Sequence, residues 1–272
     1  MKFKTLIVGA CAALLSATAF AGPFILAGTD ADDHGSVFSG TNQAGWLFMQ
    51  KSIEAIAGSV TNTKKQVVIL GSTFTAAAAA NSAFNLSTIA GTWTIQTIGT
   101  GDFANFFGGT GGVNINTAGI LLMDSGSNNV GGGVDGSNYV AYATGIDNFL
   151  GAGGGLFSQA NGYQWLTALL PSVTVTGESN TGISLTAAGN TNFPGLTNAD
   201  LSAGPYHNRF NGFGAIPVLG TSNATGQAII IGGATGSITN PGTVPEPGSL
   251  MLVGVGLLGL LSAYRKKQNK AL

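Results

Sequence analysis

Short apolar runs alternate with segments of helical periodicity along most of the chain, and this alternation constrains the fold more than any other feature. The segment 65–71 contains four consecutive apolar residues and ends in glycine, and in residues 44–60 apolar side chains recur every three or four positions. Apolar strands interleaved with helices are typical of a mainly parallel sheet with helices on both faces, because each parallel connection crosses over the sheet. The sequence therefore predicts a flavodoxin-like three-layer α/β domain over residues 22–238. The predicted strands are 24–28, 65–71, 93–98, 118–123, 155–158, 173–176, 215–219 and 228–231, and the predicted helices are 44–60, 75–84, 139–150 and 163–170.

The few charges of the chain are distributed unevenly. Only 8% of the 272 residues are charged, while 44% are hydrophobic, which is enough to bury a core. All eleven acidic residues lie between Asp30 and Glu246, whereas most of the basic residues lie at the two ends. A nucleic-acid-binding domain needs a basic surface to neutralise phosphates. The acidic interior excludes that class of function.

The N-terminus has the organisation of a secretory signal peptide. Lys2 and Lys4 precede an apolar stretch, which ends in Ala19-Phe20-Ala21 before Gly22. A basic start, a short apolar run and a small-x-small site are the three parts of such a signal. We predict a signal peptide over residues 1–21, export by the Sec translocon, and cleavage by signal peptidase between Ala21 and Gly22. Cleavage there removes the single cysteine, Cys11, and so excludes disulfides, thiolate metal sites and cysteine nucleophiles in the mature protein.

The C-terminus has three consecutive parts. A turn-rich linker, residues 239–249, contains Pro245-Glu246-Pro247 and is followed by an apolar run over 250–264 and a basic tail that begins with Arg265-Lys266-Lys267. As a helix the apolar run would be about 22 Å long, shorter than a hydrocarbon core of about 30 Å, so that insertion needs its flanks or a tilt. The basic tail is expected to stay cytoplasmic. An ordinary single-pass tail anchor would also explain residues 250–272.

This C-terminal arrangement resembles the PEP-CTERM sorting signal of Gram-negative exopolysaccharide producers, in which Pro245-Glu246-Pro247 would be the defining motif. The resemblance covers about the last 28 residues. It implies recognition by an exosortase, a membrane transpeptidase-like protease that removes the hydrophobic tail. The protein would be anchored transiently in the inner membrane and would then reach the cell surface or the extracellular matrix, where exopolysaccharide of the biofilm would be a partner.

A second resemblance lies within residues 118–171. The order strand, helix, Gly153-Gly154-Gly155, strand, turn and helix resembles the core of class I glutamine amidotransferase-like and ThuA-like domains. In that superfamily the turn after the strand carries a cysteine nucleophile. Aligned without a gap, this chain places Ala160 at the nucleophile position and keeps Gln164 at the closing glutamine. A methyl group cannot attack a carbonyl carbon, so the resemblance implies the fold and argues against amidotransferase chemistry.

A serine could replace the missing nucleophile. Ser158 lies two positions before Ala160, and a catalytic serine needs a base within hydrogen-bonding reach. His207 is a candidate base, and Glu178 is the candidate third member of a triad. The alternatives are that Ser158 is an ordinary hydroxyl at the end of a strand and that His207 anchors a loop through hydrogen bonds.

Polar residues also gather directly after the first predicted strand, at Asp30, Asp32, Asp33 and His34. Ligands of parallel α/β sheets bind at the carboxyl ends of the strands, so this loop lies at the expected edge. Its beginning resembles a calcium loop, but Thr41 stands where an EF-hand has a bidentate glutamate. Two interpretations remain. The loop could form a less regular site for calcium or another divalent metal, or it could be a solvated acidic turn whose carboxylates cap the next helix. Together with His207, these residues are the best candidates for any pocket.

Three functions therefore compete. The sequence favours a non-enzymatic exported surface or matrix protein with no cofactor, because Ala160 lacks a nucleophilic atom and few residues suited to catalysis are present. The first alternative is a secreted hydrolase or lyase that uses Ser158 or the acidic loop. The second is a sugar- or metal-binding module that acts at the loop 30–34 and His207.

Overall fold

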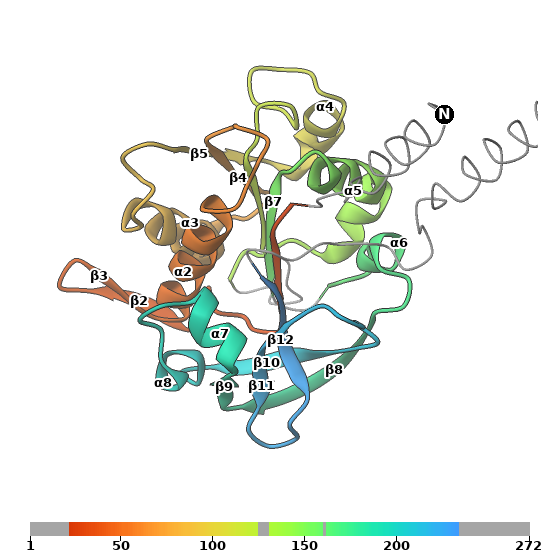
Figure 1. The fold of residues 1–272 in the computed structure, drawn as a ribbon. Helices are drawn as coiled ribbons and strands as arrows, with labels where there is room; N and C mark the ends of the chain where they lie inside the picture. Colours follow the sequence, from red (N-terminus) through yellow and green to blue (C-terminus); the bar gives the residue numbers. More distant parts are fainter. Residues whose placement is uncertain (1–21, 125–130, 160–161, 234–272) are drawn as a thin grey trace, which may run out of the picture. The chain divides into compact units, whose positions relative to one another are not determined.

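The apolar runs of the N-terminal two thirds form parallel neighbours in one sheet. The computed structural model describes residues 22–124, 131–159 and 162–233, all within one compact unit, Phe20–Ile238. The parallel strands stand in the order β5-β4-β6-β7-β1, with β1 beside β7 rather than beside β4 (Figure 1). Their bounds are β1 (Phe24–Ala27), β4 (Gln66–Leu70), β5 (Thr94–Ile98), β6 (Ile120–Asp124) and β7 (Gly155–Gln159). These five strands confirm the predicted ones, with bounds shifted by up to two residues.

The C-terminal third extends the same sheet with antiparallel strands. β12 lies beside β1 in the antiparallel sense, and β10 and β8 follow it, while β11 and β9 branch from β12. The bounds are β8 (Thr174–Thr181), β9 (Ile183–Leu185), β10 (Pro205–Asn211), β11 (Val218–Ser222) and β12 (Ala228–Gly233). The fold is therefore mixed α/β: the predicted parallel order holds for the first half of the sheet and is wrong for the second. For β11 and β12 the physical reason is that only residues 223–227 join them, whereas parallel neighbours need a long crossover.

Helices cover both faces of the sheet, as the sequence predicts. Alternate residues of each parallel strand face opposite sides, so Phe24 and Leu26 belong to one core cluster and Ile25 and Ala27 to the other. Helices α2 and α3 pack on the Ile25 side, and α4, α5 and α6 pack on the Phe24 side. The α-helices are α2 (Gly45–Ala57), α3 (Phe74–Asn85), α4 (Phe103–Phe107), α5 (Ala143–Gly151), α6 (Leu166–Leu169), α7 (Ala187–Asn192) and α8 (Asn198–Leu201), and the 3₁₀ helices are η1 (Thr100–Asp102) and η2 (Gly136–Tyr142).

Two helix predictions need correction. The segment predicted as one helix over 139–150 is divided between η2 and α5, and the helix predicted over 163–170 is only the short α6. Tyr139 explains the first difference, because its hydroxyl donates to the carbonyl oxygen of Leu70 and its ring stacks on Phe103. Those contacts hold the start of the segment to the sheet in place of a regular helical turn.

The acidic loop leads into a hairpin and not into a helix. β2 (Gly35–Phe38) and β3 (Thr41–Ala44) pair as a two-stranded antiparallel ribbon between the loop and α2. Its turn residues, Ser39 and Gly40, both have positive φ, which is the requirement of a type I′ turn. The prediction that the loop's carboxylates cap the following helix is therefore wrong: α2 follows Ala44 and has no side-chain cap.

Membrane insertion is predicted for residues 250–272, which lie outside the described residues. Within residues 22–124, 131–159 and 162–233, no helix combines the length and the apolar character needed to span a bilayer.

Candidate functional site

The loop after β1 folds inward at the carboxyl edge of the parallel strands. Asp30 is only 3% exposed and Asp32 only 2%, although both side chains are ionisable. Backbone bonds shape the turn: the amide of Asp33 donates to the carbonyl oxygen of Asp30 at 3.1 Å. The indole Nε1 of Trp46 donates to the carbonyl oxygen of Asp32 at 2.7 Å, which ties the loop to α2. The loop is therefore a buried structural element and not a solvated acidic turn.

Strand β10 brings His207 to this loop from the other end of the sequence. The amides of His207 and Asn208 both donate to the carbonyl oxygen of Gly28, at 2.6 and 3.2 Å. Strand β10 pairs with β8, and its pairing register shifts between Tyr206 and Asn208. His207 was predicted as a possible loop residue, and it lies in this strand instead.

Asp30 contacts two imidazoles through one oxygen. Its Oδ2 lies 2.9 Å from Nε2 of His207, a hydrogen bond between residues 177 positions apart, and 3.3 Å from Nε2 of His34. The imidazoles are partly exposed, at 28% for His207 and 35% for His34, whereas the carboxylate is buried. A buried carboxylate thus orients two imidazoles that solvent can reach. No hydrogen-bond partner of either Nδ1 lies among the described residues.

Two further carboxyl groups of the loop, those of Asp32 and Asp33, have raised pKa values. Burial and, after it, the nearby negative charges of Asp33 and Asp30 together raise the pKa of Asp32 from 3.8 to about 7. The pKa of Asp33 is also raised, first by burial and then by Asp30, while His34 and His207 act in the opposite direction. The loop therefore contains a carboxyl group, that of Asp32, that is about half protonated at pH 7.

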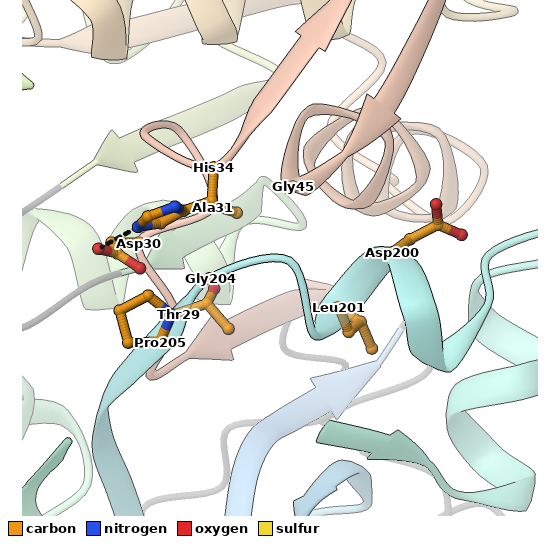
Figure 2. A pocket seen from close by; sticks show the side chains of 9 residues that line it. All are labelled: Thr29, Asp30, Ala31, His34, Gly45, Asp200, Leu201, Gly204 and Pro205. Atoms are coloured by element: carbon orange, nitrogen blue, oxygen red, sulfur yellow. Dashed lines mark ion pairs between the residues drawn. The ribbon is translucent and has the colours of Figure 1, made fainter. Parts of the chain in front are cut away.

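A small cavity adjoins Asp30. Its volume of about 10 Å³ corresponds to roughly one water molecule, and Thr29, Asp30, His34 and Gly204 line it. Figure 2 shows the imidazole of His34 turned to the carboxylate of Asp30, while the carboxylate of Asp200 points away from both. Among the described atoms, Oδ1 of Asp30 and Oγ1 of Thr29 are buried without a hydrogen-bond partner. Buried polar atoms of this kind call for a ligand or a water molecule.

Two contacts of the site come from residues outside the set predicted from the sequence. Gln159, the last residue of β7, places its Nε2 3.3 Å from Oδ1 of Asp32. A Cβ added to Gly131 would lie 2.2 Å from Oδ1 of Asp33, so the backbone after β6 reaches the loop as well. Gln159 could have been found, because it ends a predicted strand at the same edge of the sheet as Asp30.

The structure does not bring the predicted serine triad together. Ser158 is fully buried within β7. Glu178 accepts hydrogen bonds from Tyr206 and from Arg209, and the ring of His207 contacts Asp30. The three side chains therefore serve three separate contacts, because Glu178 lies on β8 and turns to its neighbours on β10.

The predicted metal ligands are Asp30, Asp32, Asp33 and His34, all in the loop after β1. Within the described part of the chain, no three or more histidine, cysteine or acidic side chains are grouped so that they could hold a metal ion. The carboxylates lie close enough to affect one another's pKa, but their oxygens do not converge on one point.

Most predicted processing residues, and Ala160, lie outside the described residues. These are Ala19, Ala21, Pro245, Glu246, Pro247, Arg265 and Lys266. Gly22, the predicted first residue of the mature chain, is described and buried. Its amide donates to the carbonyl oxygen of Leu150 at 2.6 Å, and a Cβ there would meet the carbonyl oxygen of Gly154 at 1.7 Å.

Comparison with known families identifies the C-terminal signal. Residues 243–266 match the model of the PEP-CTERM protein-sorting motif. This match supports an exported protein with a cell-surface destination and an exosortase as its processing partner, as predicted from Pro245-Glu246-Pro247. No curated protein and no solved structure matches the chain significantly. The resemblance to amidotransferase-like domains therefore stays a prediction.

Proposed function

We propose that this protein is released by an exosortase to the cell surface or biofilm matrix, and that its body acts there on an extracellular polymer by acid–base catalysis. Catalysis on an extracellular polymer corresponds to the first alternative given by the sequence, a secreted hydrolase or lyase. The observation that supports it is the buried carboxylate of Asp30 between the imidazoles of His34 and His207. The sorting motif supports the first half.

Each group of the loop would have a role in this catalysis. Both Nε2 atoms face Asp30, so the Nδ1 atoms remain to take a proton from water or from a substrate carbon. Asp30 would orient the imidazole and stabilise the imidazolium that forms, as the carboxylate of a catalytic dyad does. Asp32, with a pKa of about 7, would donate a proton to the leaving group. The acid would thus lie in the loop and a base on the loop or on β10, and the reaction would need no covalent nucleophile.

Turnover by the purified exported protein distinguishes this proposal from a non-enzymatic matrix protein. We expect the native protein to release reducing ends or new amines from extracellular polysaccharide or peptide. The substitution His207→Gln should lower the rate by about 10² to 10⁴-fold, the usual contribution of a general base. Ser158→Ala is the matched control and should keep the rate, because Ser158 lies inside β7 and outside the Asp30 contacts. If no polymer is cleaved, or if His207→Gln has the native rate, the non-enzymatic function stands instead.

A divalent cation such as calcium is a second candidate occupant of this loop. Its support is the unpartnered Oδ1 of Asp30 beside Asp32 and Asp33, whose pKa values are raised by burial and then by repulsion among the carboxylates, which a cation would relieve. Binding would require the side chains to rotate toward a common point. Running the turnover assay with calcium and with EDTA separates the two: acid–base catalysis without metal is unaffected by EDTA.

Sorting by an exosortase can be tested separately from catalysis. Deleting Pro245-Glu246-Pro247 should leave the protein in the inner membrane, because the exosortase would no longer recognise the chain. The intact mass of protein recovered from the cell surface measures this directly, since it reports cleavage at both ends. Replacing Thr239-Asn240-Pro241, in the same linker, is the control and should leave release unchanged. Normal release of the deletion variant would refute the assignment of these residues as the recognition motif.

A further inference from the structure

A second cavity lies at the opposite edge of the sheet from the Asp30 loop. Its volume is about 340 Å³, within the range of roughly 300–1,000 Å³ that is usual for small-molecule sites. Asn62 and Lys64 line it from the segment before β4, and Asn116 lines it from the segment before β6. Phe107 at the end of α4 and Asn148 on α5 also line it, and the rest of the wall is Ile115, Gly145, Phe149 and Ala152. The cavity therefore belongs to the amino ends of the parallel strands and is independent of the candidate site.

The charge of this cavity favours an anionic group. Lys64 is the one charged residue among those that line it. Elsewhere in the described chain, the ammonium group of Lys51 pairs with Glu54 at 2.9 Å and the guanidinium of Arg209 pairs with Glu178 at 3.1 Å. Lys64 makes no ion pair within the described residues. An exposed ammonium without a carboxylate partner is available to a ligand.

Three of the other lining residues, Phe107, Asn116 and Asn148, are suited to a ring with hydroxyl groups. Phe107 is partly exposed, and its ring is fixed by stacking on Tyr142 at 4.6 Å and by an edge contact with Phe106 at 5.1 Å. A Cβ added to Gly145 would lie 3.1 Å from the Phe107 ring, so a larger residue there would intrude on the wall of the cavity beside the ring. The exposed amides of Asn116 and Asn148 offer both donors and acceptors.

From these contacts we infer that the cavity binds an acidic sugar, with Lys64 against its carboxylate and Phe107 against the apolar face of its ring. The amides of Asn116 and Asn148 would bond its hydroxyl groups. The electron-rich face of an aromatic ring attracts the C–H bonds of a pyranose, whose apolar side is otherwise left in water. A simple anion such as phosphate would use Lys64 and leave the ring unused. The cation, the aromatic ring and the amides together therefore favour a carboxylated saccharide.

Calorimetric titration of the exported protein with trigalacturonate, and with maltotriose as the neutral counterpart, tests this inference. We expect trigalacturonate to bind and maltotriose to bind at least tenfold more weakly. Lys64→Gln should weaken the binding of trigalacturonate about tenfold, and added salt should weaken it in the native protein, because the ion pair is exposed to solvent. Asn148→Ala, on the exposed face of α5, should cause a several-fold loss without disturbing the core.

Lys65→Gln is the matched control, because Lys65 is the neighbouring exposed cation and does not line the cavity. It should bind trigalacturonate like the native protein, and so should His207→Gln, whose ring lies at the other edge of the sheet. The inference is overturned if trigalacturonate does not bind at millimolar concentration, or if Lys64→Gln and Lys65→Gln bind it equally well. Equal binding of inorganic phosphate would overturn it too, by showing a general anion site.

Discussion

The substitution Gly28→Ala should lower the free energy of unfolding by about 3 kcal/mol or more, since forced overpacking costs roughly 1–3 kcal/mol and here the clash is with backbone. A Cβ at this position would lie 1.9 Å from the carbonyl oxygen of Asn208. No side-chain rotation relieves such a contact, so β10 would have to move away from the end of β1. Urea unfolding measures the loss as a lower midpoint at an unchanged slope.

The same movement would also separate Asp30 from His207. The amide of Gly28 donates to the carbonyl oxygen of Ile229 at 2.8 Å, and the carbonyl oxygen of Gly28 accepts from the amides of His207 and Asn208. Gly28 is thus the point at which three strands meet, and it sets the distance on which the candidate site depends. Turnover should fall together with stability in this variant.

Gly91→Ala is the control for this prediction. Gly91 lies in an exposed turn with no atom within 4 Å of an added Cβ. That variant should keep the native stability to within about 0.5 kcal/mol, as surface substitutions usually do. A Gly28→Ala protein as stable as Gly91→Ala would show that β10 does not pack against the end of β1 in this way.

The strands that can be predicted best from the sequence are those whose own residues form a continuous apolar run. β4 is a continuous apolar run, Val67 to Leu70, that is bounded by polar residues and a glycine, and it is buried on both faces. β10 was missed because its sequence, Pro205–Asn211, starts with proline and carries His207, Asn208 and Arg209. Only its alternate residues are buried, and the partners that cover them come from distant strands.

The sequence predicts which residues belong to the candidate site, but it does not predict the contacts between them. Asp30 and His34 follow an apolar strand, which places them at the carboxyl edge of the sheet by a general rule. The hydrogen bond from His207 to Asp30 depends on where an antiparallel strand joins β1 through Gly28, and no local pattern encodes that pairing. The burial of Asp32 could not be predicted either, because an aspartate in a polar loop is usually solvated.

The stability of the protein should depend on pH through Asp32, and Asp32→Asn should remove that dependence. The pKa of Asp32 is about 7 in the folded protein and close to 4 in the unfolded chain. Between these values the folded state holds a proton that the unfolded state has released, so stability falls as the pH rises from about 4 to about 7. Below pH 4 the carboxyl is neutral in both states and imposes no such cost. Above pH 7 the loss is complete and constant.

Each unit of pKa difference corresponds to about 1.4 kcal/mol, so the loss at pH 8 should amount to a few kcal/mol. Asp32→Asn cannot ionise, and its amide oxygen can still accept the hydrogen bond from Nε2 of Gln159. We therefore expect the variant to be more stable than the native protein by roughly 2–4 kcal/mol at pH 8 and equal to it at pH 4. Urea unfolding at intervals from pH 4 to pH 8 gives both curves.

Asp147→Asn is the control, because Asp147 is exposed on α5 and away from the loop. Its stability should follow the native curve at every pH. Parallel curves for the native protein and Asp32→Asn would contradict the prediction and remove the neutral carboxylic acid from the proposed mechanism. A stabilised Asp32→Asn protein that has also lost turnover would mean that this carboxyl costs stability and is kept for its chemistry, as acids and bases at active sites are.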